Sequence, residues 1–203
     1  MTHAAHPGPL HDPPPDFPSI RLPLKAFDRE WHRVYRCAYE PLFFGRTATY
    51  RFDAPAGEFG VLYMAQNHEG AFIETLGDAA RNSATRNTLQ SDDFARRCWA
   101  AILATRPLHL VDLTGEGLVR ITADERLCSG DYDVSRRWAR AIYEHPQRPD
   151  GIYYRARHDP SQHSVALFDR ARHTVVARAE GTLLTDAALL ARLLDRYGID
   201  MIA

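Results

Sequence analysis

The sequence contains little lysine and no excess of either charge. Its 25 basic residues include a single lysine, Lys25, and 26 acidic residues balance them to a formal net charge of −1. No block of like charges occurs, so the chain lacks both the basic surface of a nucleic-acid-binding protein and an acidic tail. We therefore expect no direct binding to nucleic acid.

Cysteines and long apolar runs are also scarce. Cys37, Cys98 and Cys128 are few, odd in number and without CxxC spacing, which argues against a disulfide framework and a structural zinc site. The opening MTHAAHPGPLHDPPPDFP has neither the basic nor the apolar part of a signal peptide, and no apolar run approaches the length of a membrane span. We expect a cytoplasmic protein that does not enter a membrane.

Proline divides the chain into two parts. Seven of the 13 prolines lie in residues 1–24. Because proline fixes φ and removes a backbone donor, this stretch is predicted to be an extended N-terminal arm that is disordered, lies over its own domain or reaches a partner subunit. Residues 25–203 have enough hydrophobic side chains for one buried core, and we expect them to form a single domain.

Hydrophobic periodicity predicts a mixture of strands and helices. Strands are expected at 31–36, 59–65, 108–114, 151–157, 164–169 and 173–179. Helices are expected from an Asn67 cap to about Ala80, over 91–104 with Phe94, Cys98 and Ile102 on one face, and over 115–124, 131–145 and 185–198, the last ended by Gly198. Since the elements do not alternate strictly as βαβ units, the predicted fold class is α+β.

The helix after Asn67 carries a glutamate among small neighbours. On a helical surface the residues three and four positions from Glu74 are Gly70, Ala71, Gly77 and Asp78. Two glycines inside a helix each cost about 1 kcal/mol relative to alanine, which indicates that backbone or a ligand approaches closely there. The alternative is a solvated glutamate on an exposed face.

The segments before this helix hold groups that suit a dinucleotide. Tyr63, near the end of the strand 59–65, can offer its ring face to a planar ligand. Four arginines (33, 36, 46 and 51) precede it, and planar guanidinium groups can bind diphosphate bidentately. Arginine, aromatic ring and carboxylate therefore lie within one short stretch.

Five segments occur in the order WHRVYR, YRFDAP, GVLYMAQNHEGAFIE, VDLTG and DGIYYRARHDPSQHSVALFD, from about Trp31 to Asp169. Together they resemble the RES domain, the toxin of RES–Xre toxin–antitoxin pairs. The resemblance implies a mixed β core similar to ADP-ribosyltransferases of the diphtheria-toxin type, flanked by helices, with residues 25–203 as the catalytic domain. It also implies degradation of NAD+ by phosphorolysis or hydrolysis, and an Xre-type antitoxin as partner.

The same resemblance assigns roles to residues of this chain. Its motifs place the catalytic residues at Glu74, Arg51 and Tyr63, and the NAD+-binding residues at Arg36, Arg51 and Tyr63. Arg157 is added to the NAD+ cleft because it follows a strand position that is usually serine. Glu74 is expected to stabilise a ribosyl cation, Tyr63 to stack on nicotinamide, and Arg36 and Arg51 to hold the diphosphate.

Cleavage of NAD+ requires few catalytic groups. Nicotinamide leaves the ribose as a neutral molecule, so neither a general acid nor a second carboxylate is needed, in contrast to ordinary glycoside hydrolysis. We expect no metal cofactor. The acceptor, which is phosphate, water or a protein side chain, decides whether the enzyme is a phosphorylase, a glycohydrolase or an ADP-ribosyltransferase.

The chain departs from the family pattern at two places. It has Tyr50-Arg51-Phe52-Asp53 where glycine-arginine-phenylalanine-asparagine is usual, and Ala156 where serine is usual. Mono-ADP-ribosyl transfer to a protein and a catalytically weakened antitoxin-binding module therefore remain alternatives. A homo-oligomer and a hetero-oligomer are both open.

Two other segments resemble a Rossmann dinucleotide site and a metal site, but neither has the full pattern. In GEGLVR, Arg120 replaces the third glycine of a dinucleotide fingerprint, which argues against a Rossmann site. His158, Asp159 and His163 have no spacing that aligns them as metal ligands, so a polar turn is expected there.

Overall fold

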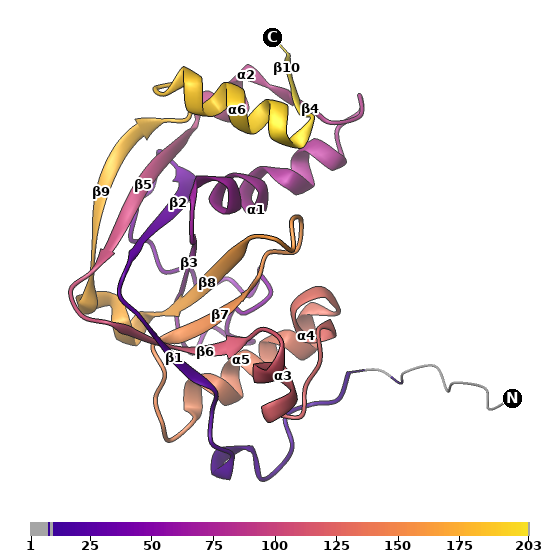
Figure 1. Cartoon of the computed structure of the whole chain (residues 1–203), viewed down its shortest axis with the longest axis vertical. Helices are drawn as coiled ribbons and strands as arrows, with labels where there is room; N and C mark the ends of the chain where they lie inside the picture. Colours follow the sequence, from indigo (N-terminus) through magenta and orange to yellow (C-terminus); the bar gives the residue numbers. More distant parts are fainter. Residues whose placement is uncertain (1–7, 9, 203) are drawn as a thin grey trace, which may run out of the picture.

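A computed structural model describes residue 8 and residues 10–202 of the protein. Its central feature is an eight-stranded mixed sheet with the strand order β1-β6-β7-β8-β3-β2-β5-β9 (Figure 1). The strands are β1 Leu24–Phe27, β2 Glu30–Arg36, β3 Val61–Ala65, β5 Arg97–Ala104, β6 Leu108–Leu113, β7 Gly151–Arg155, β8 His163–Phe168 and β9 Val175–Thr182. Within this sheet β6 and β7 are parallel and the other neighbours antiparallel, while β4 (Thr88–Gln90) and β10 (Asp200–Ile202) form a separate parallel pair.

Helices flank the sheet in two groups. The helices are α1 His68–Arg81, α2 Ser91–Ala95, α3 Glu116–Arg120, α4 Arg126–Ser129, α5 Tyr132–Glu144 and α6 Ala187–Tyr197, with short 3-10 helices η1 Phe17–Ser19 and η2 Asp169–Thr174. In Figure 1, α1 and α6 lie near β2 and β5, whereas α3, α4 and α5 gather near β6 and β7. The fold is a single α+β domain, as predicted.

Strand β3 contributes side chains to each of the three hydrophobic clusters, with Leu62 and Met64 in the cluster around Trp31. Its Val61 and Tyr63 pack with the cluster beneath α5, which includes Trp138. Its last residue, Ala65, packs with the cluster beneath α1, which includes Phe72. Tyr63 therefore lies on the strand between the residues that pack in these two clusters.

Local signals at helix ends agree with the sequence analysis. Asn67 caps α1, because its side-chain oxygen accepts a hydrogen bond of 2.8 Å from the backbone N of Gly70. Gly198 ends α6 in the left-handed conformation, with φ of 59°.

Residues 91–104 do not form the single helix that the sequence analysis predicts. Only α2 is helical, and the rest of the segment is β5, which pairs with β2 and β9. Phe94, Cys98 and Ile102 are four positions apart, and this even spacing fits one face of a strand as well as one face of a helix. Hydrogen bonding at both edges of β5 outweighs the helix propensity of its alanines and arginines.

Cys37 and Cys98 form a disulfide, so the expectation based on the low cysteine count is wrong. The antiparallel register of β2 and β5 places Arg36 opposite Arg97, and the adjoining cysteines approach to a Cα–Cα distance of 5.2 Å. Their separation of 61 residues hides this proximity from inspection of the spacing. Cys128 is free and buried, and burial raises the pKa of its thiol to about 12.

Part of the proline-rich stretch packs on the domain. Phe17 is only 2% exposed, and its ring meets that of Trp138 edge to face at 5.2 Å. Residues 1–7 and 9 of the predicted arm lie outside the described residues. Among the described residues, no helix is long and apolar enough to cross a membrane.

Candidate active site

Glu74 lies on α1 and is held by the loop that follows β7. Its Oε1 accepts hydrogen bonds from the backbone N of Arg157 at 2.9 Å and of His158 at 3.3 Å. Burial raises the pKa of Glu74, and the two backbone donors and the Arg51 charge partly oppose this shift. Glu74 is therefore a half-buried, oriented carboxylate and not the solvated surface charge of the alternative interpretation.

Gly77 allows this loop to approach α1. A Cβ atom at Gly77 would lie 2.9 Å from Cγ of His158, which is shorter than real side chains tolerate. The space that the sequence analysis inferred beside Glu74 is thus occupied by His158 of the same chain. The glycine serves a close approach that brings backbone donors to the carboxylate.

Arg51 is nearly buried, with 6% exposure, and is fixed on the side of α5. Its Nη1 donates to the carbonyl of Gly130 at 2.8 Å and to Oγ of Ser135 at 3.2 Å, and its guanidinium lies 4.5 Å from the ring centre of Tyr132. Nη2 is buried and has no hydrogen-bond partner among the described residues. Arg51 thus positions the segment between α4 and α5 and places a positive charge close enough to influence Glu74, without a direct ion pair.

Tyr63 uses its hydroxyl group within the protein. The hydroxyl donates to Oδ1 of Asp53 and accepts from the backbone N of Phe52, both at 3.0 Å. Burial raises the pKa of Tyr63 well above its usual value, so the phenol stays protonated at neutral pH. The ring packs edge to face against exposed Tyr50 at 5.5 Å, and the ring is the part of Tyr63 that remains for a ligand.

Asp53, which departs from the family pattern, supports this arrangement. It is 1% exposed, and its Oδ2 accepts from the backbone N atoms of Thr49 at 2.9 Å and Tyr50 at 2.8 Å. With its other oxygen bound to Tyr63, this carboxylate fixes the loop that carries Arg51. From the sequence alone, Asp53 stands out only as a departure from the family pattern, and nothing in its neighbourhood along the chain reveals this role.

The segment WHRVYR contains two arginines. Arg33 contacts Tyr63, whereas Arg36 makes no contact with Tyr63. Nη1 of Arg33 donates to the backbone carbonyl of Tyr63 at 2.7 Å, and burial lowers the pKa of Arg33 to about 10. Arg36 is the last residue of β2 and is exposed, with no side-chain hydrogen bond or ion pair to any described residue. In the sequence, only the alternation of side chains along the strand could have favoured Arg33 over Arg36 as a residue of the site. Arg33 lies on the same face of β2 as buried Trp31.

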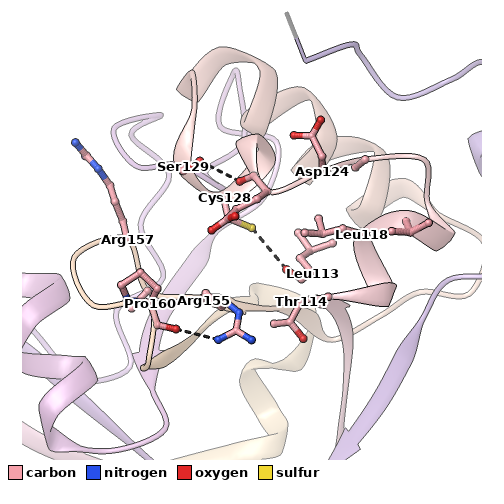
Figure 2. Close-up of a pocket in the computed structure, with 14 residues that line it drawn as sticks. Leu113, Thr114, Leu118, Asp124, Cys128, Ser129, Arg155, Arg157 and Pro160 are labelled. Atoms are coloured by element: carbon pink, nitrogen blue, oxygen red, sulfur yellow. Dashed lines mark hydrogen bonds between the residues drawn. The ribbon is translucent and has the colours of Figure 1, made fainter. Parts of the chain in front are cut away.

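Arg157 lies at the rim of a pocket of about 440 Å³ (Figure 2). The pocket is lined by the end of β6, α3, α4 and the loop after β7, and Ala156 forms part of its wall. In Figure 2 the Arg157 side chain extends away from the pocket. Its Nη1 lies 3.4 Å from the Tyr132 hydroxyl and 3.8 Å from a carboxylate oxygen of Asp78, so it bridges the space between α1 and α5.

Comparisons with known proteins identify the family of the chain. The RES domain family profile matches residues 29–186. Over 104 residues the chain is 29% identical to "Probable toxin y4kH" of Sinorhizobium fredii (strain NBRC 101917 / NGR234), an alignment that covers 51% of this chain and 81% of that protein. It is similar in fold to a chain in the crystal structure of the M. tuberculosis MbcT–MbcA toxin–antitoxin complex, with a TM-score of 0.59, 12% identity, and coverage of 84% of this chain and 91% of that one. The resemblance inferred from the ordered segments is confirmed, and the chain belongs to the RES domain family.

Proposed function

We propose that the protein is the toxin of a toxin–antitoxin pair and that it cleaves the bond between nicotinamide and ribose in NAD+. Membership of the RES domain family supports the proposal, as do the names of the relatives, one a probable toxin and the other part of a toxin–antitoxin complex. Because this reaction consumes an intracellular nucleotide, the proposed place of action is the cytoplasm.

The observation that carries the proposal is the setting of Glu74. Its Oε1 is held by two backbone amides, which leaves Oε2 available to ribose hydroxyls. When the C1–N bond breaks, the electron pair leaves with nicotinamide and positive charge grows on the sugar. A preorganised carboxylate beside that charge stabilises the transition state, and removal of one such electrostatic contact typically costs about 10²–10³ in rate.

The surrounding side chains would divide the binding of NAD+ among them. The Tyr63 ring would stack on the cationic nicotinamide, an arrangement that adds a cation–π contribution before cleavage. Arg157 is the more exposed guanidinium of the site and suits the diphosphate, whereas nearly buried Arg51 would act mainly through its charge. Arg36 remains a proposed diphosphate contact from the family resemblance alone.

The acceptor completes the reaction. Attack of a phosphate oxygen on C1 yields ADP-ribose 1-phosphate, and attack of water yields ADP-ribose and a proton. We propose phosphorolysis or hydrolysis as the activity of the site, without a metal in the catalytic step. Ala156 removes a hydroxyl from the pocket wall, and this change is the observation that keeps transfer to a protein side chain as the second candidate.

We further propose a protein antitoxin of the Xre type as partner, with a terminal segment that covers the cleft. The exposed Arg157 at the pocket rim would attract an acidic or carboxyl-terminal group of that segment. Mixing the toxin with the candidate antitoxin should then suppress NAD+ cleavage.

The proposed activity is tested by incubating the purified chain with NAD+, with and without inorganic phosphate, and measuring nicotinamide. Phosphate-dependent release supports phosphorolysis, and phosphate-independent release supports hydrolysis. Release only after a protein acceptor is added supports ADP-ribosyl transfer. No release in any arm contradicts the catalytic proposal and favours a binding module.

A further inference from the structure

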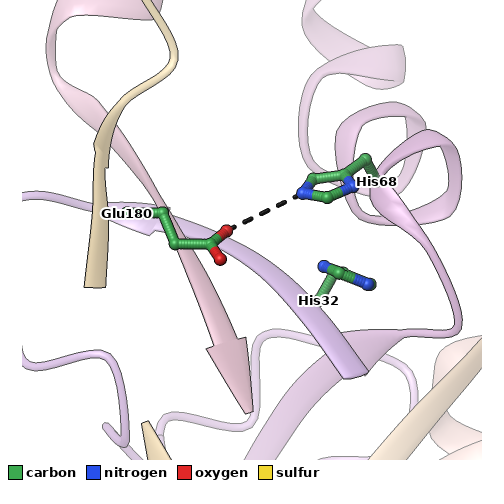
Figure 3. A group of neighbouring side chains, drawn as sticks. All are labelled: His32, His68 and Glu180. Atoms are coloured by element: carbon green, nitrogen blue, oxygen red, sulfur yellow. Dashed lines mark ion pairs between the residues drawn. The ribbon is translucent and has the colours of Figure 1, made fainter. Parts of the chain in front are cut away.

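Two histidines and a glutamate from distant parts of the sequence meet on another part of the molecule. His32 lies in β2, His68 is the first residue of α1, and Glu180 lies in β9. One ligand atom from each side chain lies within 4.8 Å of the other two. Figure 3 shows the His68 imidazole and the Glu180 carboxylate pointing toward each other, with the His32 ring beside them.

The ligand atoms lie somewhat farther apart than those of an occupied metal site. Nε2 of His68 lies 3.7 Å from Oε2 of Glu180, and the centres of the two imidazole rings are 4.0 Å apart. With zinc–ligand bonds of about 2.0–2.2 Å, tetrahedral ligand atoms are separated by roughly 3.4 Å. Side-chain rotations that shorten the longest spacing by up to about 1.4 Å would therefore complete the geometry.

The polar atoms of the cluster are incompletely satisfied by the protein. Nδ1 of His32 is buried and has no hydrogen-bond partner among the described residues, although buried polar atoms almost always have one. Its Nε2 lies 3.9 Å from a carboxylate oxygen of Glu30. This distance is longer than a hydrogen bond, but it places a carboxylate on the side of the ring where the second ring N–H of a metal-binding imidazole usually finds one.

The charges around the cluster favour a cation. Three carboxylates lie near the two imidazoles. Glu180 is 3.7 Å from His68, Glu30 is 3.9 Å from His32, and Glu69 directly follows His68 in the chain. Arg178 is the opposing charge, but it contacts Oε1 of Glu180 at 3.2 Å and leaves Oε2 facing His68.

We propose that His32, His68 and Glu180 bind one divalent transition-metal ion of the zinc class. Two imidazoles and one carboxylate favour zinc over magnesium or calcium, which prefer oxygen ligands, and water would occupy the remaining position. The ion would join β2, β9 and the first turn of α1. His68 and Glu74 are nearly two turns apart on α1 and face different sides, so the ion would stabilise the helix without touching the proposed catalytic carboxylate.

The site is tested by calorimetric titration of Zn²⁺ into the full chain, purified without a polyhistidine tag. We expect one ion per chain, and at least tenfold weaker binding by His68→Ala and by Glu180→Gln. His173→Ala, which removes an exposed histidine of η2, is the matched control and should leave the affinity unchanged. Parallel titrations with Mg²⁺ and Ca²⁺ should show no binding at this site.

Two further measurements separate loss of the site from loss of folding. Zn²⁺ at about 100 times its dissociation constant should raise the Tm of the wild type by roughly 5–10 °C and leave that of Glu180→Gln unchanged. Bound Co²⁺ should give the visible absorption of a nitrogen-ligated ion in the wild type and not in His68→Ala. Absence of Zn²⁺ binding, or equal weakening by His173→Ala, would overturn the proposal, and neither result depends on NAD+ cleavage.

Discussion

Gly77→Ala tests how the backbone donors reach Glu74. The added Cβ would lie 2.9 Å from Cγ of His158, so the ring must retreat by about 0.5 Å to reach ordinary van der Waals contact. Cγ is only two bonds from the backbone, so we expect part of this displacement to shift the loop backbone as well as to rotate the side chain. The His158 N to Glu74 Oε1 distance, already 3.3 Å, should then exceed that of a hydrogen bond.

The expected change in the stability of Gly77→Ala is the sum of two opposing effects. Alanine in place of glycine favours the helix by about 1 kcal/mol, whereas overpacking costs about 1–3 kcal/mol. Gly77→Ala should therefore destabilise the protein by about 0–2 kcal/mol. Loss of a hydrogen bond to a charged group, worth about 1.5–3 kcal/mol, should reduce the proposed NAD+ cleavage by roughly 10- to 150-fold.

A double-mutant cycle isolates the contact. In a His158→Ala background the clashing Cγ is absent, and Gly77→Ala should become stabilising by about 1 kcal/mol. Urea unfolding of the four proteins measures the stabilities, and nicotinamide release measures the activities. The reasoning is refuted if Gly77→Ala changes stability equally, within about 0.5 kcal/mol, in both backgrounds.

Two other predictions concern charge and covalent linkage. Because the pKa of Glu74 is raised, the rate of nicotinamide release should fall on the acid side with a midpoint above pH 4.5, the ordinary pKa of glutamate. A midpoint at or below 4.5 in a pH–rate profile would contradict the raised pKa of Glu74 as the cause of this loss. The disulfide closes a loop across 61 residues, so Cys37→Ser should lower the free energy of unfolding by about 2–4 kcal/mol. Unfolding of the wild type in urea with and without a thiol reductant should show the same difference, and identical curves would contradict it.

The sequence predicts best the elements whose local signals agree. Around β3 and α1, a run of β-forming residues is followed by an asparagine cap and a helical pattern, and the structure has both elements with Asn67 as the cap. Glu74 and its glycines could be recognised as unusual from helix geometry alone. Their partner, His158, could not be found, because a contact between α1 and a loop more than 80 residues later depends on the whole sheet.

Other features depend on strand pairing. The segment 97–104 satisfies helix and strand periodicities equally, and only its position between β2 and β9 decides the outcome. When 97–104 is predicted to be a helix, the proximity of Cys37 and Cys98 cannot be predicted either. The convergence of His32, His68 and Glu180 has the same cause, since it requires three non-consecutive elements to come together.

The most direct test of the account is the activity of Glu74→Gln. The variant keeps the shape of the side chain and removes its charge. A half-buried carboxylate with a raised pKa destabilises the fold increasingly as pH rises from about 4.5 through that pKa, so at neutral pH the variant should be at least as stable as the wild type.

The measurement compares nicotinamide release from NAD+ by the wild type, by Glu74→Gln and by Glu116→Gln, which alters a glutamate that is 81% exposed. We expect a loss of about 10²–10³ in rate for Glu74→Gln, with unchanged folding, and full activity for Glu116→Gln. A folded Glu74→Gln protein that cleaves NAD+ at the wild-type rate would contradict the central claim.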